Sequence, residues 1–216
     1  MMIELQNVTK VYRRGGANVI AVDDICLTIQ RGERLGILGE NGAGKSTLIK
    51  LIGGAELPSE GVVIRNMSVS WPLAMRGGLN SHLSGFANIR FLSRIYDLPF
   101  EEMVSIVQAF SGLGIRLADP VSTYSSGMRA KFSFGVSLTV EFDCYLLDEI
   151  VAVGDRNLRK KCREELLIKR NDRAIVLVAH QANIIEEYCS RCVLLENGRV
   201  VDSFDISNTR GWRKYV

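Results

Sequence analysis

The sequence contains no apolar run long enough to cross a membrane. Its most apolar region, residues 132–153, is interrupted by four acidic residues, Glu141, Asp143, Asp148 and Glu149. A membrane-spanning helix needs about twenty consecutive, mostly apolar residues. The N-terminus, which begins MMIE, also lacks the basic segment that opens a signal peptide. We therefore expect a cytosolic chain that reaches a membrane only through a partner.

The chain also has little excess charge of either sign. Its 27 lysines and arginines and 24 aspartates and glutamates leave a net charge of +3. Nucleic-acid binding usually requires a concentrated basic patch, so we expect no nucleic-acid partner. A basic run at residues 156–163 is mixed with apolar residues and is followed by Glu164 and Glu165. That pattern favours a solvated helix face.

Cysteine patterns that build metal sites or disulfide frameworks are scarce. The five cysteines are an odd number, and without an export signal they are expected to be reduced thiols. Cys189 and Cys192 have the spacing of a zinc or redox motif. A zinc site needs about four ligands, and no second cysteine pair or nearby histidine supplies them. We expect neither function.

The most informative stretch that is present is GENGAGKST, at residues 39–47. It matches the Walker A pattern G-x-x-x-x-G-K-[ST], and it lies between a strand-like segment at 34–38 and a helix-like one at 46–52. Such a loop points backbone N–H groups at phosphate oxygens, and the following helix adds partial positive charge. The phosphate-binding residues predicted by the motif are Gly39, Asn41, Gly42, Ala43, Gly44, Lys45, Ser46 and Thr47.

A second motif, FDCYLLDE at residues 142–149, has the Walker B pattern of an apolar strand that ends in two carboxylates. Asp148 and the Ser46 hydroxyl are the predicted Mg²⁺ ligands. Lys45 would reach the β- and γ-phosphates, and Glu149 would act as general base toward an attacking water. Together the two motifs predict a protein that binds and hydrolyses a nucleoside triphosphate.

The remaining pattern alternates strands and helices. Residues 3–12 and 19–30 alternate apolar and polar positions around an RRGG turn, which predicts an antiparallel pair. Further strands are expected at 61–70, 142–148 and 173–180 and around an Asn-Gly turn at 193–200. Helices are expected within 72–118 and at 126–140 and 158–169. The alternation predicts a largely parallel sheet with helices on both faces.

Two further residues are candidates for nucleotide contacts. Tyr12 closes the first strand, where its ring could stack on a purine base or simply pack at the strand end; the sequence leaves both open. His180 closes the strand at 173–180. A lone histidine is usually structural, but the carboxyl ends of parallel strands form the ligand-binding edge of such sheets. His180 could therefore sense the γ-phosphate.

The segment YSSGM at residues 124–128 resembles the signature sequence of ABC-transporter ATPases, usually written LSGGQ. The order of the motifs also fits that family, with Asp155 in the D-loop position and His180 as the switch histidine. The resemblance covers nearly the whole chain. It implies a head-to-tail homodimer in which each ATP, with Mg²⁺, lies between one phosphate loop and the partner's signature. The residues that would contact the opposite nucleotide are Ser125, Ser126, Gly127, Met128 and Asp155.

A narrower resemblance joins residues 68–74, 124–128, 141–149 and 152–155 to the ATPase subunits of capsular-polysaccharide exporters of the KpsT type. It implies an ATPase at the cytoplasmic face of a bacterial inner membrane, bound to permease subunits. A periplasmic co-polymerase and an outer-membrane channel would act further along the path. Related O-antigen and teichoic-acid exporters are the alternative. Some of them carry a C-terminal carbohydrate-binding domain, which we do not expect after Val216.

The implied fold is an α/β P-loop NTPase of the ABC ATPase type. A mostly parallel sheet flanked by helices would carry an N-terminal antiparallel β subdomain and an inserted α-helical subdomain. Residues 1–216 would form one ABC ATPase domain. Residues 1–71 and 141–216 would make the nucleotide-binding core, and residues 72–140 the helical and signature subdomain.

Three features depart from the family pattern. No glutamine occurs between Gln30 and Gln108, so the Q-loop glutamine is missing and its position falls near Met75. The signature has Ser126 for the first glycine and Met128 for the final glutamine. The D-loop at 152–155 reads AVGD in place of SALD. We expect an active but slow ATPase.

Two other protein classes fit the sequence less well. Soluble ABC-type ATPases that act on DNA or ribosomes usually carry two cassettes or a long coiled-coil insertion, and this sequence has neither. A P-loop kinase or GTPase would not explain the signature segment, and the guanine-reading N-K-x-D motif is absent.

Overall fold

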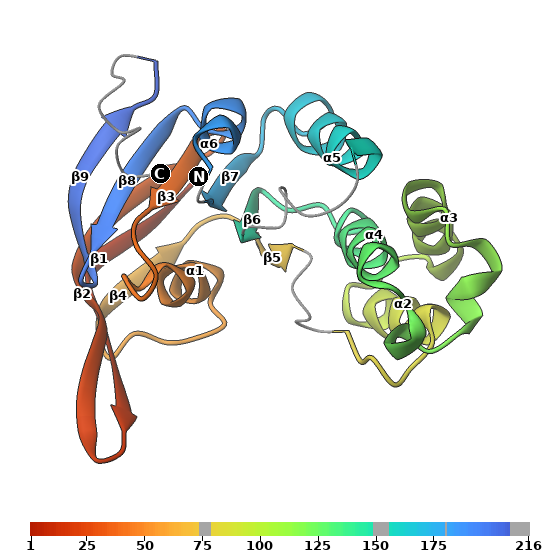
Figure 1. Ribbon diagram of the computed structural model, residues 1–216, viewed down its shortest axis with the longest axis horizontal. Helices are drawn as coiled ribbons and strands as arrows, with labels where there is room; N and C mark the ends of the chain where they lie inside the picture. Colours follow the sequence, from red (N-terminus) through yellow and green to blue (C-terminus); the bar gives the residue numbers. More distant parts are fainter. Residues whose placement is uncertain (74–78, 149–155, 180, 208–216) are drawn as a thin grey trace. The chain divides into compact units, whose positions relative to one another are not determined.

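The computed structural model describes residues 1–73, 79–148, 156–179 and 181–207 (Figure 1). The chain divides into two compact units. The first contains Met1–Pro72, Phe142–Glu149 and Asn171–Val216, and the second contains Leu73–Glu141 and Ile150–Arg170. Residues 156–170 therefore group with the helical unit, whereas the sequence-based division placed them in the core. That division into functional subdomains stays a prediction.

The predicted antiparallel pair at the N-terminus is confirmed. Strand β1 (Met2–Arg14) pairs with β2 (Ala17–Gln30) along its whole length. The turn between them contains Gly15 and Gly16, both with positive φ, a conformation that costs glycine little. Strand β4 (Glu60–Arg65) pairs antiparallel with the other edge of β1 and completes a three-stranded sheet.

The second sheet is the predicted, mostly parallel one. Its strand order is β5-β6-β7-β3-β8-β9. The strands are β3 (Arg34–Leu38), β5 (Val69–Leu73), β6 (Cys144–Asp148), β7 (Ala174–Val178), β8 (Arg191–Glu196) and β9 (Arg199–Asp205). Strand β3 is parallel to both β7 and β8, and β6 is parallel to β7. Strands β8 and β9 are antiparallel across the expected Asn-Gly turn, where Asn197 and Gly198 both have positive φ.

The prediction of one strand over residues 61–70 was wrong, because this stretch contributes to both sheets. Strand β4 lies in the first sheet and β5 in the second. Between them, the amide and the hydroxyl of Ser68 donate to Oδ2 of Asp143, at 3.0 and 2.9 Å. The Ser68 carbonyl accepts from the amide of Cys144 at 3.0 Å. These bonds to a segment 75 residues away end the first strand and direct the chain into the second sheet.

Helices cover both faces of the second sheet, as predicted. Because strand side chains alternate between faces, Leu35 and Ile37 of β3 share one face, and Gly36 lies on the other. Leu35 and Ile37 belong to the apolar cluster that includes Leu48 of helix α1 (Lys45–Gly53). On the opposite face, a Cβ on Gly36 would lie 3.1 Å from Ile185 of helix α6 (Ala182–Tyr188).

The second unit is helical. It contains α2 (Gly85–Ile95), α3 (Phe100–Ser111), α4 (Ser126–Ser137), α5 (Arg156–Arg163) and the π-helix Glu164–Ile168, with 3-10 turns at Gly114–Ala118 and Val121–Thr123. Its core is a cluster that includes Ile89, Met103, Val107, Leu117 and Phe132. In the part of the chain that the structure describes, no helix is both long and apolar enough to span a membrane.

Two predicted helices differ from the observed ones. The helix expected at 126–140 ends at Ser137. There the hydroxyls of Ser137 and Thr139 donate to carbonyls three or four residues back, and such bonds compete with helix continuation. The helix expected at 158–169 changes to a π-turn, in which the amide of Lys169 donates to the carbonyl of Glu164. The basic run at 159–163 is exposed except at Cys162, as predicted for a solvated face.

Asp143 provides a pH-dependent test of the link between the sheets. Its hydrogen bonds from Ser68, and the nearby Arg173 at 3.0 Å, lower the pKa of its carboxyl. Replacing a carboxylate that accepts several hydrogen bonds costs about 1.5–3 kcal/mol, so we expect Asp143→Asn to lower the free energy of unfolding at pH 7 by that amount. Because the pKa is lower in the folded chain, this stabilisation is full above the unfolded-state value of about 3.9. It is lost as the pH falls through the folded-state value.

The measurement is urea unfolding of wild type and Asp143→Asn at pH 7 and pH 3. The matched control is Asp172→Asn, which removes a carboxylate that also contacts Arg173 but is 55% exposed. An exposed ion pair contributes about 0–1 kcal/mol, so the control should change little at either pH. A difference between Asp143→Asn and wild type that is equal at both pH values would contradict the assignment.

Candidate nucleotide-binding site

The phosphate loop runs from the end of β3 to the start of α1. Its glycines 39, 42 and 44 have φ values of 146°, 87° and 105°. A Cβ on Gly39 would lie 2.3 Å from the carbonyl oxygen of Leu195, and one on Gly44 would lie 2.2 Å from that of Ala21. At these two positions only glycine fits. Gly42 faces open space, so there the backbone angle alone favours glycine.

Lys45 is placed inside this loop. Its side chain is 6% exposed, and its Nζ donates to the carbonyls of Gly39 and Glu40 at 2.7 and 2.9 Å. Gly44 is the N-cap of α1 and provides no side-chain capping bond. The first-turn amides of a helix have no partner within the helix, and together with the helix dipole they attract anions. The loop therefore concentrates an ammonium group and backbone donors at one point.

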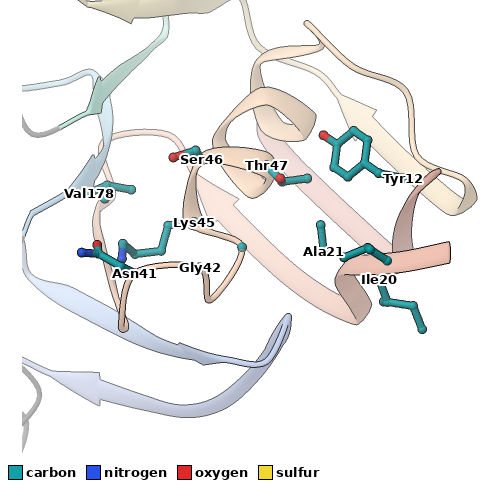
Figure 2. A pocket seen from close by; sticks show the side chains of 11 residues that line it. Tyr12, Ile20, Ala21, Asn41, Gly42, Lys45, Ser46, Thr47 and Val178 are labelled. Carbon is teal, nitrogen blue, oxygen red and sulfur yellow. The ribbon is translucent and has the colours of Figure 1, made fainter. Parts of the chain in front are cut away.

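A cavity of about 310 Å³ lies beside the loop (Figure 2). In Figure 2, Tyr12, Ile20 and Ala21 lie on one side of it, and Asn41, Lys45 and Ser46 lie on the other. The structure thus brings Tyr12 and the phosphate loop to one cavity, although they are far apart in the sequence. The complete lining is Tyr12, Val19, Ile20, Ala21, Asn41, Gly42, Gly44, Lys45, Ser46, Thr47 and Val178.

Sequence reasoning missed the apolar part of this lining. Val19 and Ile20 are 44% and 54% exposed, although both are large apolar residues. In the hairpin register, Val19 lies opposite Tyr12 and Ile20 lies opposite Val11. The sequence contains enough information to find these two residues. Counting outward from the Gly-Gly turn gives this register and places both residues beside Tyr12.

Tyr12 lies at the cavity and is also bonded to the protein. Its ring lines the cavity, and its hydroxyl donates to Oε2 of Glu56 at 2.5 Å. Lys10 also lies 5.3 Å from the ring centroid. The hydroxyl is therefore occupied by the protein, while the ring faces the cavity. Stacking on a purine stays a prediction.

The backbone of Asp148 lies at the carboxyl ends of the parallel strands, where the phosphate loop also begins. Asp148 pairs with Val178 of β7, and Val178 pairs with Ile37 of β3, the strand that precedes the loop. Val178 itself lines the cavity. The side chain of Asp148, together with Met75, Glu149, Asp155 and His180, lies outside the described residues, so the predicted roles of these groups stay predictions.

The signature segment forms the start of α4 in the second unit. Ser125 is the N-cap, and its hydroxyl accepts a hydrogen bond from the amide of Met128 at 3.2 Å. Ser125 and Ser126 are exposed, and Gly127 is partly exposed. Just before them, Tyr124 is buried, and its hydroxyl donates to the carbonyl of Arg116 at 2.9 Å. The buried tyrosine fixes the turn that presents the exposed serines.

The surroundings of the two cysteines with motif spacing differ from those of a reactive or metal-binding pair. Cys189 and Cys192 are buried, and burial raises the pKa of both thiols, that of Cys192 to about 11. Thiols that stay protonated are poor nucleophiles and poor metal ligands. Among the described residues, no group of three or more His, Cys, Asp or Glu side chains could hold a metal ion.

A strand, a glycine-rich loop and a helix with a buried lysine, set beside a parallel sheet, define a P-loop nucleotide-binding protein. The family model for ABC transporters matches residues 22–152. The chain is 47% identical over 197 residues to the ATP-binding protein BexA of Haemophilus influenzae, covering 91% of each chain. It is 46% identical over 207 residues to the capsule polysaccharide export ATP-binding protein CtrD of Neisseria meningitidis serogroup B, covering 95% of each. The chain belongs to the ABC transporter family.

The fold agrees with this assignment. A dimeric ATP-binding cassette in a post-hydrolysis state, bound to ADP and Pi, superimposes with a TM-score of 0.79. The match covers 94% of this chain and 98% of the other at 22% identity, so it bears on the fold alone. The predicted fold class is confirmed, and so is the resemblance to the ATPase subunits of polysaccharide exporters.

The glycines of the loop give a matched pair of substitutions. Gly42→Ala places a methyl group in open space and adds only the strain of a positive φ, about 1–2 kcal/mol. Gly44→Ala adds the same strain and also overlaps the carbonyl of Ala21, and such overpacking costs about 1–3 kcal/mol more. We expect Gly44→Ala to be the more destabilising by at least about 1 kcal/mol in urea unfolding. Equal losses for the two variants would contradict the close approach.

Proposed function

We propose that this chain is the ATP-binding and ATP-hydrolysing subunit of a bacterial ABC exporter that moves lipid-linked capsular polysaccharide across the inner membrane. The observation that carries the proposal is the cavity in which Lys45, Ser46 and the ring of Tyr12 meet. The export role is supported by the relatives, since CtrD is a capsule polysaccharide export ATP-binding protein and is 46% identical over nearly the whole chain.

Each part of the cavity has a proposed task. Backbone amides from Gly39 to Thr47 bind phosphate oxygens, and the ammonium of Lys45 neutralises the β- and γ-phosphates. The ring of Tyr12 stacks on adenine, and the exposed Val19 and Ile20 extend that apolar wall.

The donor set suits Mg²⁺. This ion is usually held by one or two protein groups together with substrate phosphates. Ser46 lines the cavity, and Asp148 ends the strand that pairs with Val178 at the cavity wall. When bound, Mg²⁺ neutralises charge on the phosphate oxygens. Glu149, the next residue, would accept the proton of the attacking water, and His180 would donate to the γ-phosphate.

The proposed assembly is a head-to-tail homodimer at the cytoplasmic face of the inner membrane, bound to permease subunits. Ser125, Ser126, Gly127 and Met128 would close over the nucleotide of the partner subunit, together with Asp155. The exposed start of α4 is suited to this role, because exposed hydroxyl and amide donors can reach a phosphate. The solved cassette of similar fold is itself a dimer. A periplasmic co-polymerase and an outer-membrane channel complete the proposed complex.

The export role is tested by purification. The tagged chain is expressed in its native cell, and the membranes are solubilised in mild detergent. We expect a polytopic membrane protein to co-purify with it at one-to-one stoichiometry. Recovery of the chain with ribosomes or DNA, or without any membrane protein, would overturn the export role and leave the nucleotide chemistry in place.

The general base is tested by Glu149→Gln. A general base contributes about 10²–10⁴-fold to a rate, so we expect ATP hydrolysis to fall at least about a hundredfold. ATP binding should persist and a stable dimer should form, as measured by phosphate release and by size-exclusion chromatography with ATP. Glu101→Gln, on the exposed first turn of α3, is the control. Wild-type turnover in Glu149→Gln would show that another group is the base.

A further inference from the structure

The loop that follows α1 is bonded to the strand that carries Tyr12. The amide of Ser59 donates to the carbonyl of Thr9 at 2.8 Å, and the amide of Val11 donates to the Ser59 hydroxyl at 3.0 Å. Lys10 Nζ donates to the carbonyl of Leu57 at 2.8 Å. Helix α1 begins at the phosphate loop, and the loop after it fixes the end of β1. One helix therefore connects the phosphate part of the cavity to the base part.

Glu56 is the centre of this connection. Its Oε2 accepts from the Tyr12 hydroxyl at 2.5 Å, and its Oε1 accepts from Lys50 Nζ at 3.1 Å. Lys10 Nζ lies 3.4 Å from Oε2 and 5.3 Å from the centroid of the Tyr12 ring. The side chains of Glu56 and Lys10 are only 23% and 17% exposed. Two lysines thus balance the negative charge of the Glu56 carboxylate, and one of its oxygens accepts the hydrogen bond from the tyrosine.

This arrangement restricts a side chain that would otherwise move. A tyrosine on an exposed hairpin can adopt several rotamers, and ordering one on ligand binding weakens the affinity by about two- to tenfold. A hydrogen bond to an ionised acceptor is stronger than a neutral one. The contacts with Tyr12 and both lysines also lower the pKa of the Glu56 carboxyl, so the acceptor stays ionised at neutral pH. Glu56 thus holds the hydroxyl of Tyr12, a residue that lines the cavity.

We propose that Glu56 is a positioning residue for nucleotide binding, which holds the ring of Tyr12 in the orientation that receives the base. The proposal rests on the proposed contact between Tyr12 and adenine. Glu56 acts through the tyrosine hydroxyl and does not touch the nucleotide itself. Its loss should therefore weaken the binding of ligands that carry a base and leave the binding of a bare polyphosphate unchanged.

The test measures the Kd of Mg-ATP and of magnesium tripolyphosphate for the full chain and its variants. The bond is present with or without ligand, so its loss acts through the cost of ordering the released tyrosine on binding, which is worth about a two- to tenfold change in Kd. We expect Glu56→Ala to weaken ATP by about two- to tenfold and to leave the affinity for tripolyphosphate unchanged. Glu60→Ala, a nearby exposed glutamate, is the matched control and should change neither. A structural role alone would weaken both ligands equally and would overturn the proposal.

Tyr12→Phe removes the hydroxyl that donates this hydrogen bond, and it leaves the contacts of Glu56 with both lysines in place. It should reproduce the effect of Glu56→Ala, and the double variant should be no weaker than either single variant. Fully additive losses would overturn the proposal. If Glu56→Ala does not fold, Tyr12→Phe decides the outcome, since a normal ATP affinity would show that the bond does not position the ring.

Tyr12→Ala distinguishes the positioning role of Glu56 from the adenine contact of Tyr12, on which that role rests. If Tyr12→Ala weakens ATP selectively but Tyr12→Phe and Glu56→Ala do not, only the positioning role fails. If Tyr12→Ala has no selective effect while Lys45→Ala abolishes the binding of both ligands, the adenine contact of Tyr12 fails and the positioning role fails with it.

Discussion

Two backbone carbonyls, one from each sheet, confine the phosphate loop. Ala21 of β2 approaches Gly44, and Leu195 of β8 approaches Gly39, so closely that neither glycine has room for a Cβ. The turn after β8 continues the contact, because Gly198 donates to the carbonyl of Ala43 and accepts from the amide of Asp23. Backbone contacts therefore confine the loop at both ends, and the Lys45 side chain adds hydrogen bonds to two of its carbonyls. The placement of Lys45 and of helix α1 depends on these backbone contacts.

Because of these contacts, the site can form only when the first sheet is in its correct position. The register of β2 decides which carbonyl meets Gly44, and it also places Val19 opposite Tyr12. A shift of one residue in this hairpin would turn every side chain to the other face and would move the ring of Tyr12 away from the cavity. The apolar wall of the cavity and one of the two contacts that confine the phosphate loop thus depend on the same strand pairing, although the wall and the loop come from different parts of the chain.

The sequence predicted best what is encoded locally. The phosphate loop is a contiguous pattern, and the hairpin of β1 and β2 follows from alternation around a Gly-Gly turn. Features that depend on distant partners could not be predicted. The division between β4 and β5 depends on bonds from Ser68 to Asp143, and alternation cannot reveal which sheet a strand joins. The Tyr12 to Glu56 bond spans 44 residues. The observed end of α4 is a local feature, but it depends on hydroxyl bonds that the apolar spacing does not encode.

The missing side-chain cap of α1 has a consequence for the life of the protein in the cell. Because Gly44 leaves the first-turn amides of α1 without a capping side chain, an anion bound there would supply the missing acceptor. The free energy of binding is then also free energy of folding, and a ligand at a hundred times its Kd adds about 2.7 kcal/mol to stability. Proteolysis acts on the small unfolded fraction, so a nucleotide bound at this loop would also protect the chain from degradation.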